Sequence, residues 1–324
     1  MVHINALILS CGTRCLLVDY FMQRENGFDK VVAVDCSKYA PALYRADKRF
    51  IVPRMNDPEY LPTILEIAEK EEIDLVLPLQ EDELLFISEN QDAFRERKIL
   101  PVISDRSVVE LCRDKYRFSQ KLTEWGIPAV PTFLSREIGR VKQEYGFPIY
   151  MKPRNGAGSV SNYVLDNDKM SFLAENDDEA AYVIQPMIEG EEYGVNAYVD
   201  LVSGKTAELF ILKKLRMRSG ETEKSVSVHD ETIKEMAEAV LEKMKFRGPV
   251  DIDVLKKDGR YYILEVNPRF GGAYPHTHSC GVNFIRLLSK NAAGTANPES
   301  VTDYEEGVTA FRYMSICTMK EDVL

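Results

Sequence analysis

Three polar side chains at alternate positions end an apolar run near residue 265. Residues 261–267 read Tyr-Tyr-Ile-Leu-Glu-Val-Asn, and Pro268 and Arg269 follow. Because successive side chains of a strand point to opposite faces, Glu265, Asn267 and Arg269 are predicted to share one face. A carboxylate, an amide oxygen and a guanidinium together suit a site that holds Mg²⁺ against a polyphosphate. The alternative is a strand that simply emerges into a polar loop.

A second acidic strand precedes this one across a predicted hairpin. Asp251 and Asp253 alternate with apolar residues there, and Lys-Lys-Asp-Gly-Arg connects the two strands. A two-residue turn at 258–259 would place both aspartates on the face opposite Glu265. We therefore predict a three-residue loop at 257–259 with its glycine in the left-handed conformation, which gathers the acids on one side. Such hard oxygen ligands suit magnesium or manganese rather than zinc.

Two segments in the middle of the chain have residues suited to a nucleotide. A strand ends in Lys152, and Arg-Asn-Gly-Ala-Gly-Ser-Val follows at 154–160. The two glycines and the serine let backbone N–H groups close on phosphate oxygens, although a plain hairpin turn is the alternative. The spacing is not that of a P-loop. At 182–194 a strand runs into a Pro-containing connection and an acidic pair, which offers backbone groups to an adenine edge and a carboxylate to a ribose.

Composition narrows the function classes. The chain has 324 residues, so two or three structural units are expected. Its 52 acidic and 41 basic residues give a net charge of −11, which argues against nucleic acid or an anionic membrane as the main partner. The six cysteines form no disulfide or zinc spacing, and we find no signal peptide or membrane span. We therefore expect a cytoplasmic protein.

The first 105 residues alternate short apolar runs with helical patterns, which predicts a small parallel α/β domain. One glycine, Gly12, stands where a dinucleotide-binding loop needs three, so a nicotinamide cofactor is excluded. The acidic run at 80–83 follows a strand and could reach a ligand, but a solvated helix start is the simpler interpretation. Capped helices begin after Asp105 and Asp114, strands then dominate, and a long amphipathic helix follows Asp230.

The motifs together carry a resemblance. Asp114-Lys115, Met151-Lys152-Pro153 with the 154–160 loop, Gln185 to Glu192, and Glu265 to Arg269 occur in the order and spacing of the ATP-grasp superfamily. The set looks most like the ATP-binding module of the carbamoyl-phosphate synthase large subunit and its single-module relatives, amino-acid and peptide ligases among them. It spans residues 105 to 275, and the first hundred residues resemble the N-terminal α/β domain that usually precedes this module.

The resemblance implies a role for each matching residue. Lys115 and Lys152 would bind the ATP phosphates under a loop that contains Gly156, Gly158 and Ser159. Gln185 stands where many relatives have a glutamate facing the adenine amine, and its neutral amide oxygen still accepts a hydrogen bond. The remaining implied roles are adenine contact for Met187 and Ile188, ribose binding for Glu192, metal binding for Asp253, Glu265 and Asn267, and stabilisation of the transferred phosphoryl group by Arg269.

The implied fold is α/β plus α+β, with an N-terminal parallel domain (1–105), a small ATP-grasp subdomain with the glycine-rich loop (106–184) and a C-terminal subdomain with the metal site (185–324). The implied activity is an ATP-dependent ligase that joins a carboxylate to an amine through an acyl phosphate. An ATP-grasp phosphotransferase and an inactive nucleotide-binding protein are the alternatives, and carbamoyl phosphate synthesis is disfavoured because only one module is present. The expected partners are ATP, Mg²⁺ or Mn²⁺, a carboxylate, an amine and a second copy in a homodimer, without nucleic acid or membrane.

Substrate identity is not determined by these motifs. Residues 213–220 cluster four cations beside the predicted ATP site, and Lys213 among them is a candidate catalytic cation that could grip a carboxylate as well as phosphate. A solvated basic strand end is the alternative. The segment 271–278, which contains His276 and His278, could line an acceptor pocket, although His-x-His in a loop is more often mere loop.

Overall fold

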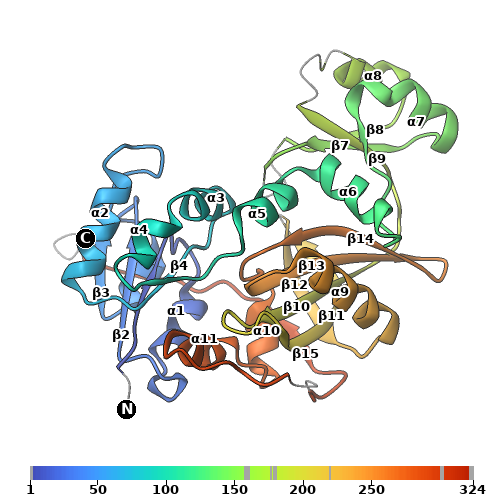
Figure 1. The fold of residues 1–324 in the computed structure, drawn as a ribbon. Helices are drawn as coiled ribbons and strands as arrows, with labels where there is room; N and C mark the ends of the chain where they lie inside the picture. The colour runs from blue at the N-terminus through green and yellow to red at the C-terminus, as the bar shows by residue number, and fades with distance from the viewer. Residues whose placement is uncertain are drawn as a thin grey trace.

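The structure is a computed structural model, and it describes residues 3–156, 161–175, 177, 181–218, 220–299 and 303–320. Three sheets follow one another along the chain (Figure 1). One cavity is lined by residues from all three parts of the chain. A parallel sheet comes first, a small antiparallel sheet second and a large antiparallel sheet third. The predicted combination of a parallel α/β domain with a two-subdomain α+β module is confirmed.

The N-terminal sheet is parallel throughout, with the strand order β3-β2-β1-β4-β5. Alternate side chains of the central strands pack against helices on the two faces, α1 on one and α2 and α4 on the other. The order reverses between β1 and β4, and the carboxyl ends of strands at such a switch point are the usual place for ligands. The elements are β1 (Asn5–Ile8), α1 (Cys15–Met22), β2 (Lys30–Asp35), β3 (Lys48–Ile51), α2 (Tyr60–Lys70), β4 (Leu75–Leu77), α3 (Glu81–Glu89), α4 (Gln91–Arg95) and β5 (Leu100–Pro101), with short 3-10 turns at Arg24–Asn26 and Pro41–Arg45.

Two helices lead into the small sheet, and the cap predicted at Asp105 makes no side-chain hydrogen bond to the first of them. Asp114 caps the second of them by accepting a hydrogen bond from the backbone N–H of Arg117 at 3.1 Å. The small sheet has the order β6-β9-β7-β8, and β9 ends at Pro186, two residues beyond the expected subdomain boundary at 184. The elements are α5 (Arg106–Arg113), α6 (Lys115–Glu124), β6 (Phe133–Leu134), a 3-10 turn (Ser135–Glu137), α7 (Ile138–Tyr145), β7 (Ile149–Pro153), β8 (Tyr163–Leu165), α8 (Asp168–Glu175) and β9 (Tyr182–Pro186).

The large sheet has the order β14-β13-β10-β11-β12-β15 and is antiparallel. One face packs its apolar side chains against the long helix α9, whose N-cap is Asp230 as predicted. The opposite face turns toward the cavity. The elements are β10 (Glu191–Val199), β11 (Thr206–Arg218), β12 (Glu221–Ser227), α9 (Glu231–Met244), β13 (Gly248–Lys257), β14 (Arg260–Asn267), α10 (Tyr274–Ser279), α11 (Phe284–Ala292) and β15 (Thr309–Phe311).

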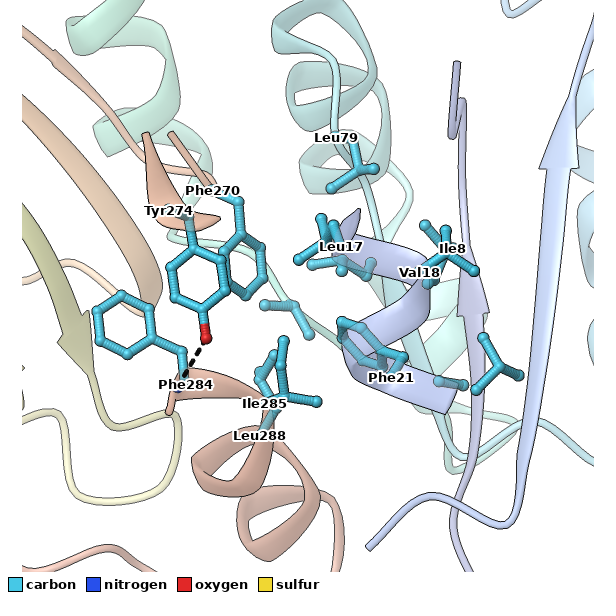
Figure 2. Close-up of a cluster of buried hydrophobic side chains, with 14 of the residues drawn as sticks. Ile8, Leu17, Val18, Phe21, Leu79, Phe270, Tyr274, Phe284, Ile285 and Leu288 are labelled. Atoms are coloured by element: carbon cyan, nitrogen blue, oxygen red, sulfur yellow. Dashed lines mark hydrogen bonds between the residues drawn. The ribbon is translucent and has the colours of Figure 1, made fainter. Parts of the chain in front are cut away.

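The N-terminal domain and the end of the chain share one hydrophobic core. Leu17 and Phe21 of α1 lie against Ile285 and Leu288 of α11, and Tyr274 fills the space between them and the large sheet (Figure 2). The Tyr274 hydroxyl accepts a hydrogen bond from the backbone N–H of residue 284 at 3.0 Å. Close packing of this kind fixes the position of the loop that precedes α1 relative to the segment that follows β14.

No helix among the described residues is both long enough and apolar enough to span a membrane.

Candidate active site

The hairpin between β13 and β14 brings the predicted acids together, but not by the predicted turn. Lys257 pairs with Arg260, so the turn contains only residues 258 and 259, with φ of 50° and 74°. The three-residue loop is therefore wrong, because two residues with positive φ already match the twist of the strands. Farther from the turn, the pairing of the two strands shifts by one residue, because Val254 pairs with Ile263 but Asp253 pairs with Glu265.

Leu264 is the extra, unpaired residue of a β-bulge at this shift. The bulge places the acids on one face, which the three-residue loop was expected to do. Below it, Asp253 lies directly opposite Glu265, and Asp251 lies opposite Asn267. Directly opposed side chains of an antiparallel pair lie on the same face. The predicted grouping of these four residues is therefore present in the structure.

The same face continues across β10 and β11. Gly194 pairs with Asp253, and Glu192 pairs with Lys214 on the next strand. Lys214 is nearly buried, and its Nζ lies 2.6 Å from Asp253 Oδ1. Lys213 is not brought into this group, because strand alternation turns it to the other face, where it pairs with Glu191. The structure thus points to Lys214 rather than Lys213 as the cation beside the acids.

A cavity of about 520 Å³ lies between the large sheet, the small sheet and the N-terminal domain. Its walls come from all three parts of the chain. Of the predicted site residues, Lys115, Lys152, Gly156, Gln185, Met187, Ile188, Glu192, Asp253, Glu265, Asn267 and Arg269 line it. Gly158 and Ser159 lie outside the described residues.

Lys152 is the most notable cation in the cavity. It is 6% exposed, and within the described part of the chain its ammonium has no hydrogen-bond or ion-pair partner. Burial lowers the pKa of Lys152, while the charge of Glu265 raises it. Lys115 begins α6, donates to the carbonyl oxygen of Gly156 at 2.7 Å, and also has a pKa lowered by burial. Two cavity ammonium groups, one with a single hydrogen bond and one with no partner among the described residues, are suited to phosphate oxygens.

The pKa values of Asp253 and Glu265 are shifted in opposite directions. Burial, together with Asp251 and Glu265, raises the pKa of Asp253 to about 7, although Lys214 opposes the shift. Burial also acts against the charge of Glu265, but Lys152 and Lys115 lower its pKa below the usual range overall. Glu265 therefore stays ionised at neutral pH beside the two lysines.

The residues present fit a metal bound together with a nucleotide. Among the described residues no three of His, Cys, Asp and Glu come together as a metal cluster. The oxygens available are those of Asp253, Glu265 and Asn267, and Asn267 Nδ2 already donates to Glu265 Oε1 at 3.3 Å. Magnesium is commonly held by one or two carboxylates plus substrate phosphates and waters, so this incomplete set suits a metal completed by phosphate oxygens.

The residues predicted to contact adenine also line the cavity. Gln185 is 4% exposed, and its Nε2 donates to Thr132 Oγ1 at 2.8 Å, which leaves the amide oxygen for a ligand. Met187 and Ile188 follow it on the wall, and the backbone N–H of Met187 already bonds to the carbonyl oxygen of Pro148 at 3.1 Å. Glu192 lies at the rim, 3.9 Å from Lys214 Nζ.

Arg269 links the cavity to the N-terminal domain. One terminal nitrogen lies 3.2 Å from Asp251 Oδ2, and the other lies 3.4 Å from Glu81 Oε1 at the start of α3. Burial raises the pKa of Glu81, while the charge of Arg269 lowers it. The solvated helix start predicted for this acidic run is wrong at Glu81, which lines the cavity, and at Glu83, which is fully buried.

Among the charged cavity residues, Arg14 was not predicted from the sequence, and ligand contact of the run that contains Glu81 was only the weaker interpretation. Each follows one of the strands beside the switch point of the parallel sheet, β1 for Arg14 and β4 for Glu81. Strand order was the signal that would have found them. His276 and His278 do not reach the cavity: His276 is buried against Ser225 Oγ, and His278 stacks on Tyr20 at a ring distance of 3.8 Å.

Family comparison agrees with this geometry. Residues 112–273, half of the chain, match the family model described as "ATP-grasp domain". The chain belongs to the ATP-grasp family. Residues 6–103 also match the model "PylC-like, N-terminal domain". The resemblance inferred from the motifs is confirmed.

Curated relatives of this ATP-grasp chain include the arginine-specific large chains of carbamoyl phosphate synthase from Geobacillus stearothermophilus and Bacillus subtilis. The first is 24% identical over 221 residues, 64% of this chain and 21% of the relative. The second is 22% identical over 291 residues, 84% of this chain and 27% of the relative. The ATP-grasp chain thus spans about a quarter of the length of these proteins.

Solved structures with the same fold include two whose nucleotide is bound. The biotin carboxylase domain dimer of Hydrogenobacter thermophilus 2-oxoglutarate carboxylase, in complex with MgADP, ADP and bicarbonate, has a TM-score of 0.76 at 18% identity and covers 94% of this chain and 73% of that one. Staphylococcus aureus N5-carboxyaminoimidazole synthetase complexed with ADP has a TM-score of 0.72 at 16% identity and covers 91% and 79%. At these identities the likeness concerns the fold of the ATP-grasp chain.

Proposed function

We propose that the protein is an ATP-dependent ligase that joins a carboxylate to an amine and releases ADP and phosphate. The observation that carries the proposal is the meeting of Lys152 with Glu265 in one buried cavity. An ammonium that has no partner among the described residues lies with an ionised carboxylate and an amide oxygen, and this combination suits phosphate and a divalent cation together. The relatives named above, which include synthetases and nucleotide-bound carboxylases, support the same class.

The proposed nucleotide pose uses residues that line the cavity. Gln185, Met187 and Ile188 border the adenine, Glu192 accepts hydrogen bonds from the ribose, and Lys115 and Lys152 hold the phosphates. Asp253, Glu265 and Asn267 would hold Mg²⁺ or Mn²⁺. The metal would supply charge neutralisation of the triphosphate. This pose leaves the γ-phosphate near Arg269, where both protein domains meet.

The chemistry divides into two displacements. In the first, a carboxylate oxygen forms a bond to the γ-phosphorus, the bond to the bridging oxygen breaks, and its electron pair leaves on ADP. In the second, an amine nitrogen bonds to the acyl carbon and the carbon–oxygen bond to phosphate breaks. An ammonium substrate gives up two protons, one to the phosphate and one to solvent. Arg269 stabilises the negative charge that develops in both steps.

No nucleophilic side chain is required, because positioning and charge neutralisation carry phosphoryl transfer. The residues of the cavity agree with this requirement. Its cysteine, Cys112, has a pKa that burial raises well above its ordinary value, so the thiol is neutral and unreactive.

Measurement of ADP release tests the proposal. A panel of carboxylates is assayed with ATP and Mg²⁺, each alone and with each of a panel of amines. Ligase activity requires ADP release that depends on both partners, and hydroxylamine in place of the amine should trap the acyl phosphate as a hydroxamate. Release with a carboxylate alone and a stable phosphorylated product would identify a phosphotransferase instead. Nucleotide binding without ADP release from any pair would contradict the proposal.

A further inference from the structure

The cavity is also lined by residues outside the proposed nucleotide site, and they come from the N-terminal domain and from the C-terminal part of the chain. They are Arg14, from the loop between β1 and α1, residues 220–222 at the start of β12, and residues 272–273 after β14. An added Cβ at Gly272 would lie 3.9 Å from Arg14 Nη1 and 4.0 Å from Glu221 Oε1, which places both side chains over this glycine. We call these residues the far compartment.

One guanidinium of the far compartment has no ion-pair partner among the described residues. Arg269 uses its two terminal nitrogens on Glu81 and Asp251, and Glu221 pairs with Arg312. Arg14 has a different situation: within the described chain its one hydrogen bond is to the carbonyl oxygen of Gly271, at 3.3 Å, and no carboxylate lies within ion-pair distance. A guanidinium has five N–H donors, so most of those of Arg14 remain for a ligand.

Packing fixes Arg14 in this position. It is the N-cap residue of α1, and the next turn of that helix carries Leu17 and Val18 into the core shared with Phe270 and Tyr274 (Figure 2). The residue therefore sits on a buried helix whose partner segment also forms the far wall of the compartment. Burial and the neighbouring Arg269 lower the pKa of Arg14, although a guanidinium remains charged at any physiological pH.

The anion that Arg14 suits is distinct from the triphosphate. Lys115 and Lys152, the lysines proposed for the triphosphate, belong to α6 and β7, whereas Arg14 lies against Gly271 and beside Gly272, after β14. Arg269, whose two terminal nitrogens lie on Glu81 and Asp251, is the cation proposed for the γ-phosphate. A carboxylate that attacks the γ-phosphate is therefore placed at Arg269, so a group on Arg14 is a second anionic group.

We propose that Arg14 is a specificity-determining residue that binds an anionic group of a substrate, a carboxylate or a phosphate, which does not itself react. The inference rests on the proposed ligase function and deepens it. It predicts that one substrate carries a second negative charge, as an amino acid, a dicarboxylate or a phosphorylated amine does. Simple monocarboxylates with neutral amines would then be poor substrates.

The test uses full-length Arg14→Gln and Arg14→Lys, with Arg24→Gln as a matched control on the surface of the same domain, where Arg24 pairs with Asp47. ADP release is measured for substrate pairs that differ in one anionic group: succinate against butyrate, amino acids against their amides, and phosphoethanolamine against ethanolamine. The pair that shows the preference distinguishes a carboxylate from a phosphate.

We expect Arg14→Gln to raise the KM of the anion-bearing compound about ten- to hundredfold, the value of a lost charge-assisted contact, and to leave its neutral analogue and the KM for ATP within about twofold. Arg14→Lys should restore part of the preference, and Arg24→Gln should behave as wild type. An equal rise for both members of a pair, or no rise, would overturn the proposal, since the first indicates a merely structural role.

A binding measurement separates failure of this inference from failure of the ligase function. Succinate, glutamate and phosphoethanolamine are titrated calorimetrically into the wild-type protein and Arg14→Gln in the presence of ADP and Mg²⁺. Binding that Arg14→Gln abolishes supports the anion site even if no compound gives ADP release. Absence of binding and of any substrate preference in the wild-type protein would overturn it, whatever the outcome for ATP.

Discussion

The two ends of the cavity are built in different ways. The end proposed to bind the nucleotide, which we call the nucleotide end, is formed by strands and a helix start within residues 112–273, and its key side chains alternate along β13, β14 and β10. The far compartment is formed by loops from three separate parts of the chain, and a shared core holds them together. A site on alternating strands can be recognised from local sequence, whereas a site on converging loops requires the topology.

The first way to test this difference is to remove a metal-binding charge at the nucleotide end. Glu265→Gln keeps the shape of the side chain, so ATP affinity should change less than about tenfold, while turnover should fall about a hundredfold or more. ADP release and nucleotide binding by calorimetry measure the two effects. Asp258→Asn, at the exposed hairpin tip, is the matched control, and normal turnover of Glu265→Gln at limiting Mg²⁺ would place the metal elsewhere.

The second test concerns Lys152, whose ammonium has no partner among the described residues. Lys152→Ala removes a charge-assisted contact with phosphate worth about 1.5 to 3 kcal/mol, so ATP affinity should fall roughly ten- to hundredfold. Lys213→Ala should change affinity far less, because Lys213 pairs with Glu191 away from the cavity. Calorimetric titration with ATP analogues compares the two variants. An equal loss of ATP affinity in both variants would show that Lys213 also belongs to the site. Unchanged ATP affinity of Lys152→Ala would contradict the proposal that Lys152 binds phosphate.

A third test addresses the loops that support the far compartment. Glu83 is 1% exposed and accepts hydrogen bonds from Tyr60 and, at 2.8 Å, from Ser10, which links the first turn of α3 to the loop after β1. Burial raises the pKa of Glu83 to about 7. Because this folded-state pKa lies above that of the unfolded chain, folding favours the neutral carboxyl, and its contribution is lost as pH rises through about 7.

We therefore expect ionisation of Glu83 to lower the free energy of unfolding by about 2 to 3 kcal/mol between pH 5 and pH 8. Glu83→Gln is neutral at every pH, so it should flatten that part of the profile. Urea denaturation of both proteins at several pH values measures the difference. Parallel profiles would show that Glu83 does not titrate in this range.

The smallest effect is expected at the hairpin tip. Gly259 has a φ of 74°, and an added Cβ there meets nothing within 4 Å, so Gly259→Val is strained only through its backbone. The cost should be about 1 to 2 kcal/mol of unfolding free energy, with Gly259→Asn clearly milder. ATP affinity should stay the same in both, because the bulge at Leu264 separates the tip from the acids. A loss of affinity in Gly259→Val would show that tip and site are coupled.

Local periodicity was enough to predict the central strands, the Asp230 cap and the face that carries Glu265 and Asn267. Periodicity failed where a single residue decides which face of a strand a side chain occupies. The bulge at Leu264 leaves no mark in an apolar run, and Lys213 and Lys214 cannot be told apart until the strand face is known. Arg14 was missed for another reason: its role depends on strand order and on the packing of α1 against α11.

The bulge at Leu264 also makes the hairpin tip a place where the chain can change length without changing the chemistry below it. The register that sets Asp253 opposite Glu265 is established on the far side of the bulge from the turn, and the turn itself is exposed. A peptide tag or a fluorescent label inserted between Asp258 and Gly259 should therefore report on the protein in solution while the nucleotide end keeps its native geometry.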